Sequence, residues 1–311
     1  MMRSRTHRLL LAGMLVLLGA LTTHAQVEVD ISFRRSLYMV YEPLLCTVTI
    51  KNMSGATLDL TDTSREKWFG FQIETTDGRP LPPINPDYRN QAVELAAGQK
   101  LTRTINLTPL YPLNEFGTYR VRAAVYCKQF KRYFVSSKLN VNITEGRIIW
   151  QKTVGVPEGA GVGRARIYSL LSHRLPKRTM LYLRVEDREN GVIYGTTQLG
   201  RFLSFGEPDA EVDSASQIHI LQNTAPKAFL YSHFDINGRL LKQQGYQAFD
   251  TRPYLVNKDN VVMVIGGVPY DVNAKSPTAE LPKIGDRPVP MPTPQGKPTP
   301  EDARPKNLLS E

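Results

Sequence analysis

Two histidines, His219 and His233, are the strongest candidates for chemistry in this 311-residue chain. A hairpin turn near Ala225 would place them diagonally on one face of two paired strands, with about 7 to 8 Å between their backbones. A third metal ligand would come from Asp235 or from the acidic loop 207–213. Zinc needs three or four converging ligands, and nothing in the sequence fixes a third one at this face. We therefore expect ordinary surface histidines, with no bound metal and no cofactor.

The sequence contains no motif that is typical of nucleophilic catalysis. The serine nucleophile of a hydrolase must form a hydrogen bond with a histidine. Ser232 and His233 are adjacent in a predicted strand, so their side chains face opposite sides of the sheet and cannot form this pair. Neither a Gly-x-Ser-x-Gly elbow nor a His-Glu-x-x-His helix occurs. Paired carboxylates, as in glycosidases, have no fixed spacing in a sequence. We expect no catalytic residue and no enzyme activity, and an envelope hydrolase with an unidentified site stays open as an alternative.

A turn rich in cationic and aromatic side chains is the most suggestive binding feature. Rigid sandwiches often recognise partners through their loops, and cations beside aromatic rings suit an acidic glycan or a protein surface. Two arginines on the outer face of the preceding strand extend the cluster, so cations and rings are expected to converge near one end. The predicted partner-binding residues are Arg120, Arg122, Tyr126, Lys128, Phe130, Lys131, Arg132 and Tyr133.

Cys46 and Cys127 are the only cysteines of the chain. Period-two alternation puts both side chains on the inward faces of predicted strands, and an oxidising compartment would let them pair. Cys46 lies early in its strand and Cys127 late in its own, which could place them at opposite ends of a sandwich. A Cys46–Cys127 disulfide and two buried free thiols are both compatible with the sequence.

The N-terminal segment, residues 1–25, has the pattern of a signal peptide. Three arginines within the first eight residues precede the apolar run Leu9–Leu21, and Thr23–Ala25 offers a small-residue cleavage site. The apolar run is shorter than the roughly 18 to 20 residues of a membrane span. We expect a secreted protein, periplasmic or extracellular, with no transmembrane span after signal cleavage.

Charge argues against nucleic acid as a partner. The formal net charge is +10, and removal of the three N-terminal arginines leaves +7. That charge is divided as +3, +3 and +1 over residues 26–145, 146–273 and 274–311, so the sequence predicts no dedicated basic face. With 41% hydrophobic residues, the chain is also too apolar to be wholly disordered.

Strict alternation of apolar and polar residues predicts half-buried antiparallel strands. Turn signals separate them, including Asp77-Gly78 and Ala97-Gly98. About seven short strands in roughly 120 residues is the pattern of an immunoglobulin-like sandwich, which we place at residues 26–145. The alternating sets are Val27, Val29, Ile31 and Phe33; Cys46, Val48 and Ile50; Phe69, Phe71 and Ile73; Ile105 and Leu107; and Ser137, Leu139, Val141 and Ile143.

These strands and turns resemble bacterial secreted Ig-like β-sandwiches. The resemblance is carried by Tyr41-Glu42-Pro43, Lys51–Gly55, Asp77-Gly78, Leu95–Gln99 and Gly117–Ala123. The layout is also similar to the bacterial proteinase-inhibitor sandwich domain, which implies proteinase inhibition as an alternative function. The match covers the N-terminal half only, while the whole chain resembles uncharacterised secreted bacterial proteins.

Residues 146–273 predict a second all-β domain, either a sandwich or a small barrel. Asn190-Gly191 and Asn237-Gly238 lie between apolar runs, which is typical of two-residue hairpin turns with positive φ at both positions. Residues 274–311 contain 9 of the 22 prolines and are expected to form a disordered Pro-rich tail.

Taken together, these patterns predict an exported, non-enzymatic binding or structural protein of the cell envelope. Its expected partner is an envelope or extracellular protein or an acidic glycan. A proteinase inhibitor and an envelope hydrolase are the alternatives.

Overall fold

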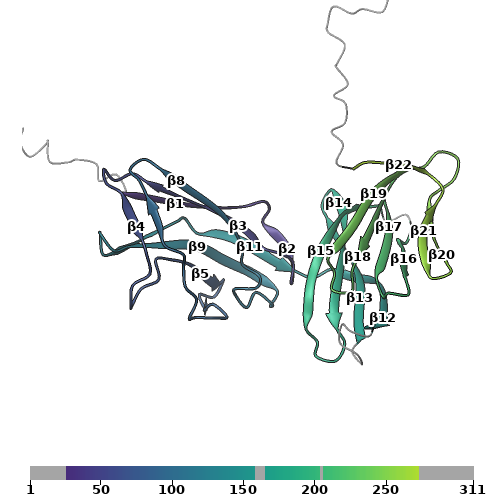
Figure 1. Cartoon of the computed structure of the whole chain (residues 1–311), viewed down its shortest axis with the longest axis horizontal. Helices are drawn as coiled ribbons and strands as arrows, with labels where there is room; N and C mark the ends of the chain where they lie inside the picture. The colour runs from purple at the N-terminus through teal and green to yellow at the C-terminus, as the bar shows by residue number, and fades with distance from the viewer. Residues whose placement is uncertain (1–25, 158–164, 204–205, 273–311) are drawn as a thin grey trace, which may run out of the picture. The chain divides into compact units, whose positions relative to one another are not determined.

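The structure, a computed structural model, describes residues 26–157, 165–203 and 206–272 (Figure 1). The predicted signal peptide, residues 1–25, and the predicted Pro-rich tail, residues 274–311, lie outside these ranges. Across the described ranges the secondary structure is all β, as the alternation predicts. No helix in the described part of the chain is long and apolar enough to cross a membrane.

The N-terminal half forms an Ig-like sandwich whose strands pair antiparallel, except for the parallel pair of β2 and β11. One sheet has the order β1-β3-β8, with β1 (Val27–Phe33), β3 (Leu45–Asn52) and β8 (Lys100–Asn106). The other has the order β2-β11-β9-β5-β6, with β2 (Leu37–Met39), β11 (Leu139–Thr144), β9 (Gly117–Cys127), β5 (Phe69–Thr75) and β6 (Pro80–Leu81). β10 (Arg132–Val135) pairs with β9, and a separate ribbon joins β4 (Leu58–Leu60) to β7 (Val93–Leu95).

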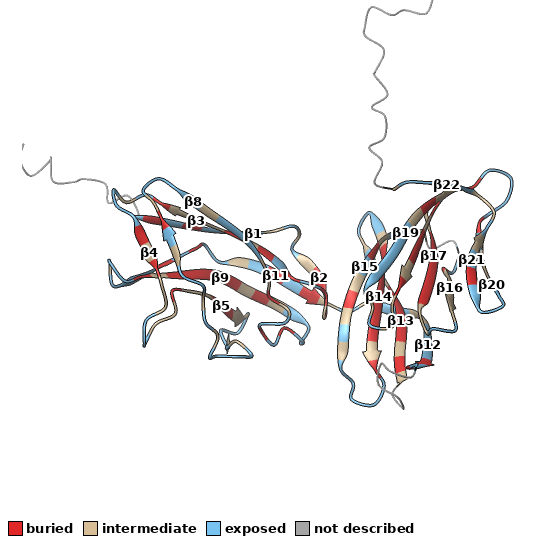
Figure 2. Cartoon of the chain, viewed as in Figure 1, coloured by how far each residue is buried: buried red, intermediate tan, exposed pale blue. Residues whose placement is uncertain are grey.

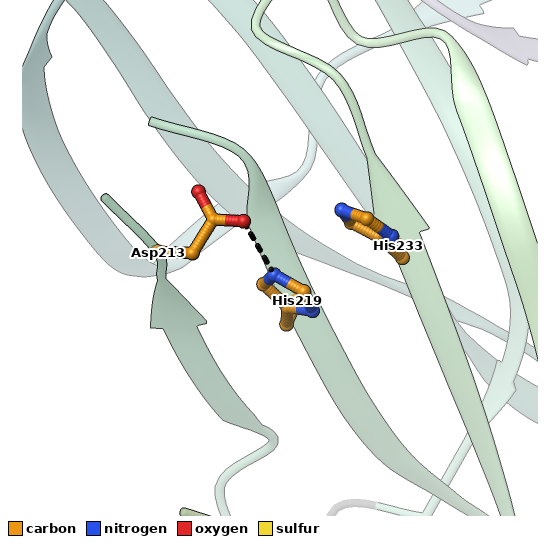
Figure 3. A group of neighbouring side chains, drawn as sticks. All are labelled: Asp213, His219 and His233. Carbon is orange, nitrogen blue, oxygen red and sulfur yellow. Dashed lines mark hydrogen bonds and ion pairs between the residues drawn. The ribbon is translucent and has the colours of Figure 1, made fainter. Parts of the chain in front are cut away.

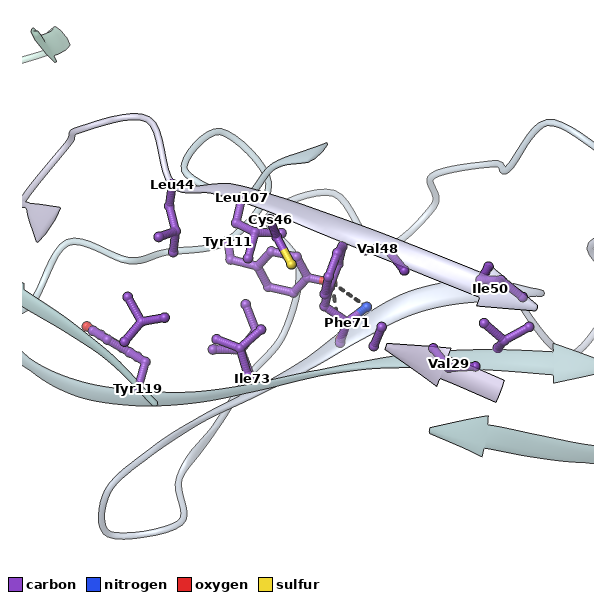
Figure 4. Close-up of a cluster of buried hydrophobic side chains, with 14 of the residues drawn as sticks. Val29, Leu44, Cys46, Val48, Ile50, Phe71, Ile73, Leu107, Tyr111 and Tyr119 are labelled. Atoms are coloured by element: carbon purple, nitrogen blue, oxygen red, sulfur yellow. Dashed lines mark hydrogen bonds between the residues drawn. The ribbon is translucent and has the colours of Figure 1, made fainter. Parts of the chain in front are cut away.

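The core of this sandwich is built from the alternating side chains of the two sheets. Val48 and Ile50 project from β3, while Ile73 and Tyr119 project from β5 and β9 (Figure 4). All are at least 97% buried, and buried positions alternate with more exposed ones along β3 (Figure 2). Burial of each large apolar side chain contributes about 1.5 to 3 kcal/mol, so this alternation stabilises the packed sheets.

Cys46 and Cys127 are both in this core, as free thiols. Burial raises the pKa of Cys46 to about 12 and that of Cys127 to about 11. Thiols with such high pKa values are protonated at neutral pH and poorly nucleophilic. The two cysteines therefore act as small apolar core residues in this structure, and the Cys46–Cys127 disulfide is not formed.

The C-terminal half forms a second sandwich, not a closed barrel, within the described residues. One sheet contains β12 (Arg147–Gly155), β13 (Ala165–Leu175), β14 (Arg178–Asp187) and β15 (Ile193–Phe202). The other contains β16 (Asp209–Val212), β17 (Ile218–Ala225), β18 (Ala228–Phe234), β19 (Leu240–Gln247) and β22 (Val268–Tyr270). Buried side chains of both sheets share one core, including Tyr168, Leu170, Leu183, Ile218 and Phe234.

A β-hairpin packs on the other face of this second sheet. It consists of β20 (Tyr254–Lys258) and β21 (Val261–Ile265), whose residues Leu255 and Val264 contact Leu221 and Tyr231 in a small apolar cluster. Polar side chains on that face of β17 and β18 are therefore adjacent to packed apolar groups.

The hairpin turns differ from the expected geometry. Gly191 and Gly238 have positive φ, at 63° and 81°, but Asn190 and Asn237 do not, so these are not two-residue turns with positive φ at both positions. The loops are longer, because an aspartate at the start of each, Asp187 or Asp235, accepts backbone N–H groups. The two-residue turn with both φ values positive lies instead between β20 and β21, at residues 259–260, with φ of 52° and 63°.

Asn52 illustrates how a buried polar side chain secures the first sandwich. It is fully buried at the end of β3, and its amide nitrogen donates to the carbonyl oxygens of Ala56 and Leu95, each at 2.8 Å. We expect Asn52→Ala to lower the free energy of unfolding by about 1 to 3 kcal/mol, because both carbonyls lose this donor. Urea unfolding measures the loss. The exposed Asn140→Ala is the control and should change stability by less than about 0.5 kcal/mol.

Candidate functional site

The predicted binding turn lies between β9 and β10, and one of its three cations, Lys128, has an ionic partner. Lys128 forms an ion pair with Asp59, and the hydroxyl of Tyr133 donates to Glu66. The rings of Tyr133 and Tyr126 lie 5.1 Å apart. The ion pair with Asp59 neutralises Lys128, one of the cations that the sequence assigns to a partner.

The remaining turn residues divide between the core and solvent. Phe130 packs against the core, with its ring 5.8 Å from that of Phe134. The guanidinium of Arg132 covers the same Phe134 ring at 4.5 Å. Lys131 is exposed and has a positive φ of 50°, so it is a turn residue whose charge faces solvent.

Arg120 and Arg122 do not join this turn. They precede Lys128 by eight and six residues along the extended chain, which is a separation of about 20 to 26 Å. Each is engaged by β5: Arg120 lies 3.6 Å from the Glu74 carboxylate, and Arg122 donates to Gln72 at 2.6 Å. The expected convergence of all eight residues is therefore wrong, because strand length separates residues that share a face.

A better candidate for binding is a groove lined by β5 and β8, with a volume of about 400 Å³. Its wall combines aromatic rings with aliphatic side chains and two arginines. β8 is the last strand of its sheet, and β6 pairs with β5 only at Ile73 and Glu74, so both lining strands present edges. The lining residues that matter below are Phe69, Phe71, Tyr88, Tyr111, Ile84, Leu110, Arg89, Arg103 and Ile105.

Side chains replace the missing strand along the edge of β5. The hydroxyl of Tyr88 donates to the carbonyl oxygen of Phe69 at 3.0 Å. The hydroxyl of Tyr111 accepts from Phe71 N and donates to Phe71 O, both at 3.2 Å (Figure 4). A Cβ at Gly70 would lie 2.6 Å from the Tyr88 hydroxyl, so glycine leaves space for this close approach. The edge thus has its hydrogen bonds satisfied without a neighbouring strand.

Asp62 fixes the loop that contains Asn90, one of the residues that line the groove. Its carboxylate accepts from Asn90 N, from Asn90 Nδ2 and from Trp68 N, each at 2.9 Å. Burial by itself would raise the pKa of the Asp62 carboxyl, but these hydrogen bonds and nearby Lys67 outweigh it, and the pKa lies below its usual value of 3.8. Asn90 in turn donates to Phe69 O at 2.9 Å, which connects the carboxylate to the groove.

Two exposed apolar side chains stand at the rim. Ile84 is 62% exposed and Leu110 is 44% exposed, and the backbone N–H of Ile84 donates to the carbonyl of Leu110 at 2.8 Å. Arg89 and Arg103 are also exposed, and neither forms an ion pair with a described residue. The groove therefore offers an apolar floor, an apolar rim and two uncompensated cations.

Sequence reasoning missed this groove because its walls come from distant segments. One signal was available: Pro82 and Pro83 follow β6 directly. Proline lacks the N–H that a ladder needs, so these residues end the pairing with β5 and leave the Phe69–Phe71 stretch unpaired on that side.

The second candidate site is the cluster of Asp213, His219 and His233 (Figure 3). One potential ligand atom from each residue lies within 4.8 Å of the others. His219 and His233 are directly opposite each other on β17 and β18, not diagonal, because the turn lies between Ala225 and Ala228, further along than predicted, and the pairing shifts register between Asn223 and Ala225. Their rings stack with centroids 4.1 Å apart.

Hydrogen bonds define the orientation of this cluster. His219 is 5% exposed, so it is not a surface histidine; its Nδ1 lies 2.7 Å from the Tyr231 hydroxyl and its Nε2 lies 3.2 Å from Asp213 Oδ2. His233 Nε2 lies 2.6 Å from the side-chain oxygen of Gln217. Burial, followed by the neighbouring His219, lowers the pKa of His233 below its usual 6.5, so its neutral form is favoured.

The described residues thus form an all-β fold with a candidate binding groove in one sandwich and a histidine–aspartate cluster in the other. No family model matches the sequence, and no curated protein matches it. Among solved structures, it is similar to the CARDB domain of a Pyrococcus furiosus protein in complex with di-metal ions, at 18% identity and a TM-score of 0.26 over 38% of this chain and 87% of that chain.

Two further solved structures are similar at a comparable level. The sporulation control protein Spo0M from Bacillus subtilis has 10% identity and a TM-score of 0.26 over 68% of this chain and 79% of its own. The periplasmic chaperone SfaE has 11% identity and a TM-score of 0.23 over 70% of this chain and 97% of its own. At these TM-scores the similarities carry no argument about function.

The edge contacts of Tyr111 can be tested by removing one oxygen atom. We expect Tyr111→Phe to lower the free energy of unfolding by about 1 to 3 kcal/mol, because the N–H and C=O of Phe71 both lose their partner. Chemical denaturation of the variant measures the effect. The exposed Tyr254→Phe should be within about 0.5 kcal/mol of the unchanged chain, and an equal loss in both would contradict the assigned role.

The low pKa of Asp62 predicts a pH dependence. A carboxyl whose pKa is lower in the folded state contributes stability above its unfolded value of 3.8, and this is lost as the pH falls through the folded value. Asp62→Asn should therefore destabilise the chain at pH 7 by about 1.5 to 3 kcal/mol, and the difference should shrink below that pKa. Urea unfolding at pH 7 and at acid pH checks this, with the exposed Asp87→Asn as the neutral control.

Proposed function

We propose that the chain is an exported, non-enzymatic binding protein of the cell envelope or extracellular medium. Its first sandwich binds an extended segment of a partner protein in the groove lined by β5 and β8. Export is supported by the N-terminal sequence alone, since the basic start, the apolar run Leu9–Leu21 and the cleavage site precede the described residues. The groove is the observation that carries the binding function.

The composition of the groove supports binding of an apolar segment. Ligand sites are concave, mostly apolar and supplied with a few directed polar groups. Phe69, Phe71 and Tyr111 line the groove, and exposed Ile84 and Leu110 flank it. Exposed apolar groups beside a concave surface are typical of interaction sites, because their contact with water is removed when a partner binds.

The strand edge supports an extended conformation for that segment. β8 has β3 on one side and, among the described strands, none on the other. Unpaired N–H and C=O groups on an edge strand can form a ladder with an added strand, and alternate side chains of the added strand then enter the groove. Arg103 on β8 and Arg89, which both line the groove, are suited to acidic side chains on the segment. We therefore expect a partner segment with alternating apolar residues and flanking carboxylates.

Peptide selection on the full chain tests this proposal. Displayed random peptides of about ten residues, the length of a long strand, are selected for binding, and one selected peptide is labelled for fluorescence anisotropy. Leu110→Lys should weaken its binding by about tenfold or more, because a buried apolar contact of about 1.4 kcal/mol corresponds to that factor. Leu110 is 44% exposed, so the variant should remain folded.

The matched control is Leu240→Lys, which alters a similarly exposed leucine, 45% exposed, in the second sandwich. It should leave peptide affinity unchanged. Equal binding to both variants would place the peptide outside the groove. Binding of an acidic polysaccharide that Arg103→Ala abolishes, with no peptide selected, would reject a protein segment as the occupant.

A further inference from the structure

We propose that Asp213, His219 and His233 form a binding site for a divalent transition-metal ion, with Zn²⁺ as the best match. In the second sandwich, Asp213 lies on the turn after β16, His219 on β17 and His233 on β18. It does not depend on the groove of the first sandwich, and the two proposals can fail separately.

The donor set is the first argument. Two imidazole nitrogens and one carboxylate oxygen are ligands that Zn²⁺ takes in tetrahedral sites. Hard cations such as Mg²⁺ and Ca²⁺ prefer oxygen ligands, so imidazoles favour a transition metal. The three donors lie on the turn after β16, on β17 and on β18, and the pairing of these strands brings them together. Sequence spacing alone did not predict that Asp213 would be the third ligand.

Distance is the second argument. With Zn–ligand bonds of about 2.0 to 2.1 Å, neighbouring ligand atoms of a tetrahedron lie about 3.3 Å apart. His219 Nε2 and Asp213 Oδ2 are already 3.2 Å apart. His233 must tilt out of its stack with His219 and approach by about 1.5 Å at most, since its ligand atom lies within 4.8 Å of both. His233 is only partly buried, which leaves its ring space to move.

The outer contacts are the third argument, because metal-binding histidines usually donate their second N–H to a partner. Tyr231 lies 2.7 Å from His219 Nδ1 and can accept that N–H when the metal occupies Nε2. Asp213 Oδ1 accepts the backbone N–H groups of Ala215 and Gln217, at 2.9 and 2.8 Å, which leaves Oδ2 directed at the histidine. These contacts orient two of the three ligands in advance.

A fourth donor is present beside the cluster. The side-chain oxygen of Gln217 lies 2.6 Å from His233 Nε2 and could complete a tetrahedron around an ion that separates them. On binding, the ion takes the lone pair of His219 Nε2, and the imidazole proton then lies on Nδ1, which donates it to the Tyr231 hydroxyl. The bound ion would connect the β16–β17 turn to β18 and so stabilise this edge of the second sandwich.

Zinc titration of the purified, tag-free full chain tests the site. After treatment with a chelator, isothermal titration calorimetry with ZnCl₂ should show saturable binding of about one ion per chain, and the melting temperature should rise with Zn²⁺ but not with Mg²⁺. His233→Gln should weaken zinc binding by about 100-fold or more. His173→Gln, which changes a histidine outside the cluster, should leave affinity unchanged.

Asp213→Asn provides a second variant that should fold, since asparagine retains the oxygen that accepts the turn N–H groups. It should also weaken binding by at least about tenfold. On the unchanged chain, Co²⁺ should give the intense visible absorption of a tetrahedral site, which requires no variant. The absence of saturable zinc binding, or an equal loss in His173→Gln, would overturn the proposal and leave the cluster as a hydrogen-bonded network only.

Discussion

The register between neighbouring antiparallel strands is the constraint on which the rest of this structure depends. Side chains alternate between two faces, so a shift of one residue would move a whole apolar set from the core into solvent. In the second sandwich, burial of Ile218 against Phe234 sets the pairing of β17 with β18. The residues one position along, His219 and His233, must then face each other on the opposite side. A polar cluster is thus positioned by the apolar core behind it.

Unpaired strand edges impose a second constraint on the first sandwich. Backbone N–H and C=O groups at a buried edge need partners, and a sheet that ends without a strand must supply them from side chains. Tyr111 and Tyr88 do so for Phe71 and Phe69. Side chains satisfy the hydrogen bonds without filling the space a strand would take, and the groove is the volume that remains. The same contacts that stabilise β5 therefore create the candidate binding surface.

Much of the fold could be predicted from the sequence, because alternation is a local signal. The apolar sets that begin at Val27, Cys46 and Phe69 all lie on β-strands with the expected faces buried. The candidate sites were harder to predict from the sequence. The cations of the predicted turn were correctly placed on and beside a hairpin, yet Lys128 is neutralised by Asp59, which is 69 residues away in the chain. Charge compensation of this kind is a tertiary contact that composition does not reveal.

The sequence by itself determined the strands, their inward faces and the all-β class, since period-two alternation and glycine-containing turns act over a few residues. The domain boundary near residue 145 and export by residues 1–25 stay predictions from sequence. Only the tertiary structure decided which polar groups meet. The position of the β17–β18 turn and the register shift beside it bring His233 opposite His219, and the turn after β16 brings Asp213 to both. Pairing across strands depends on the packing of the whole core, and so no local pattern in the chain could specify it.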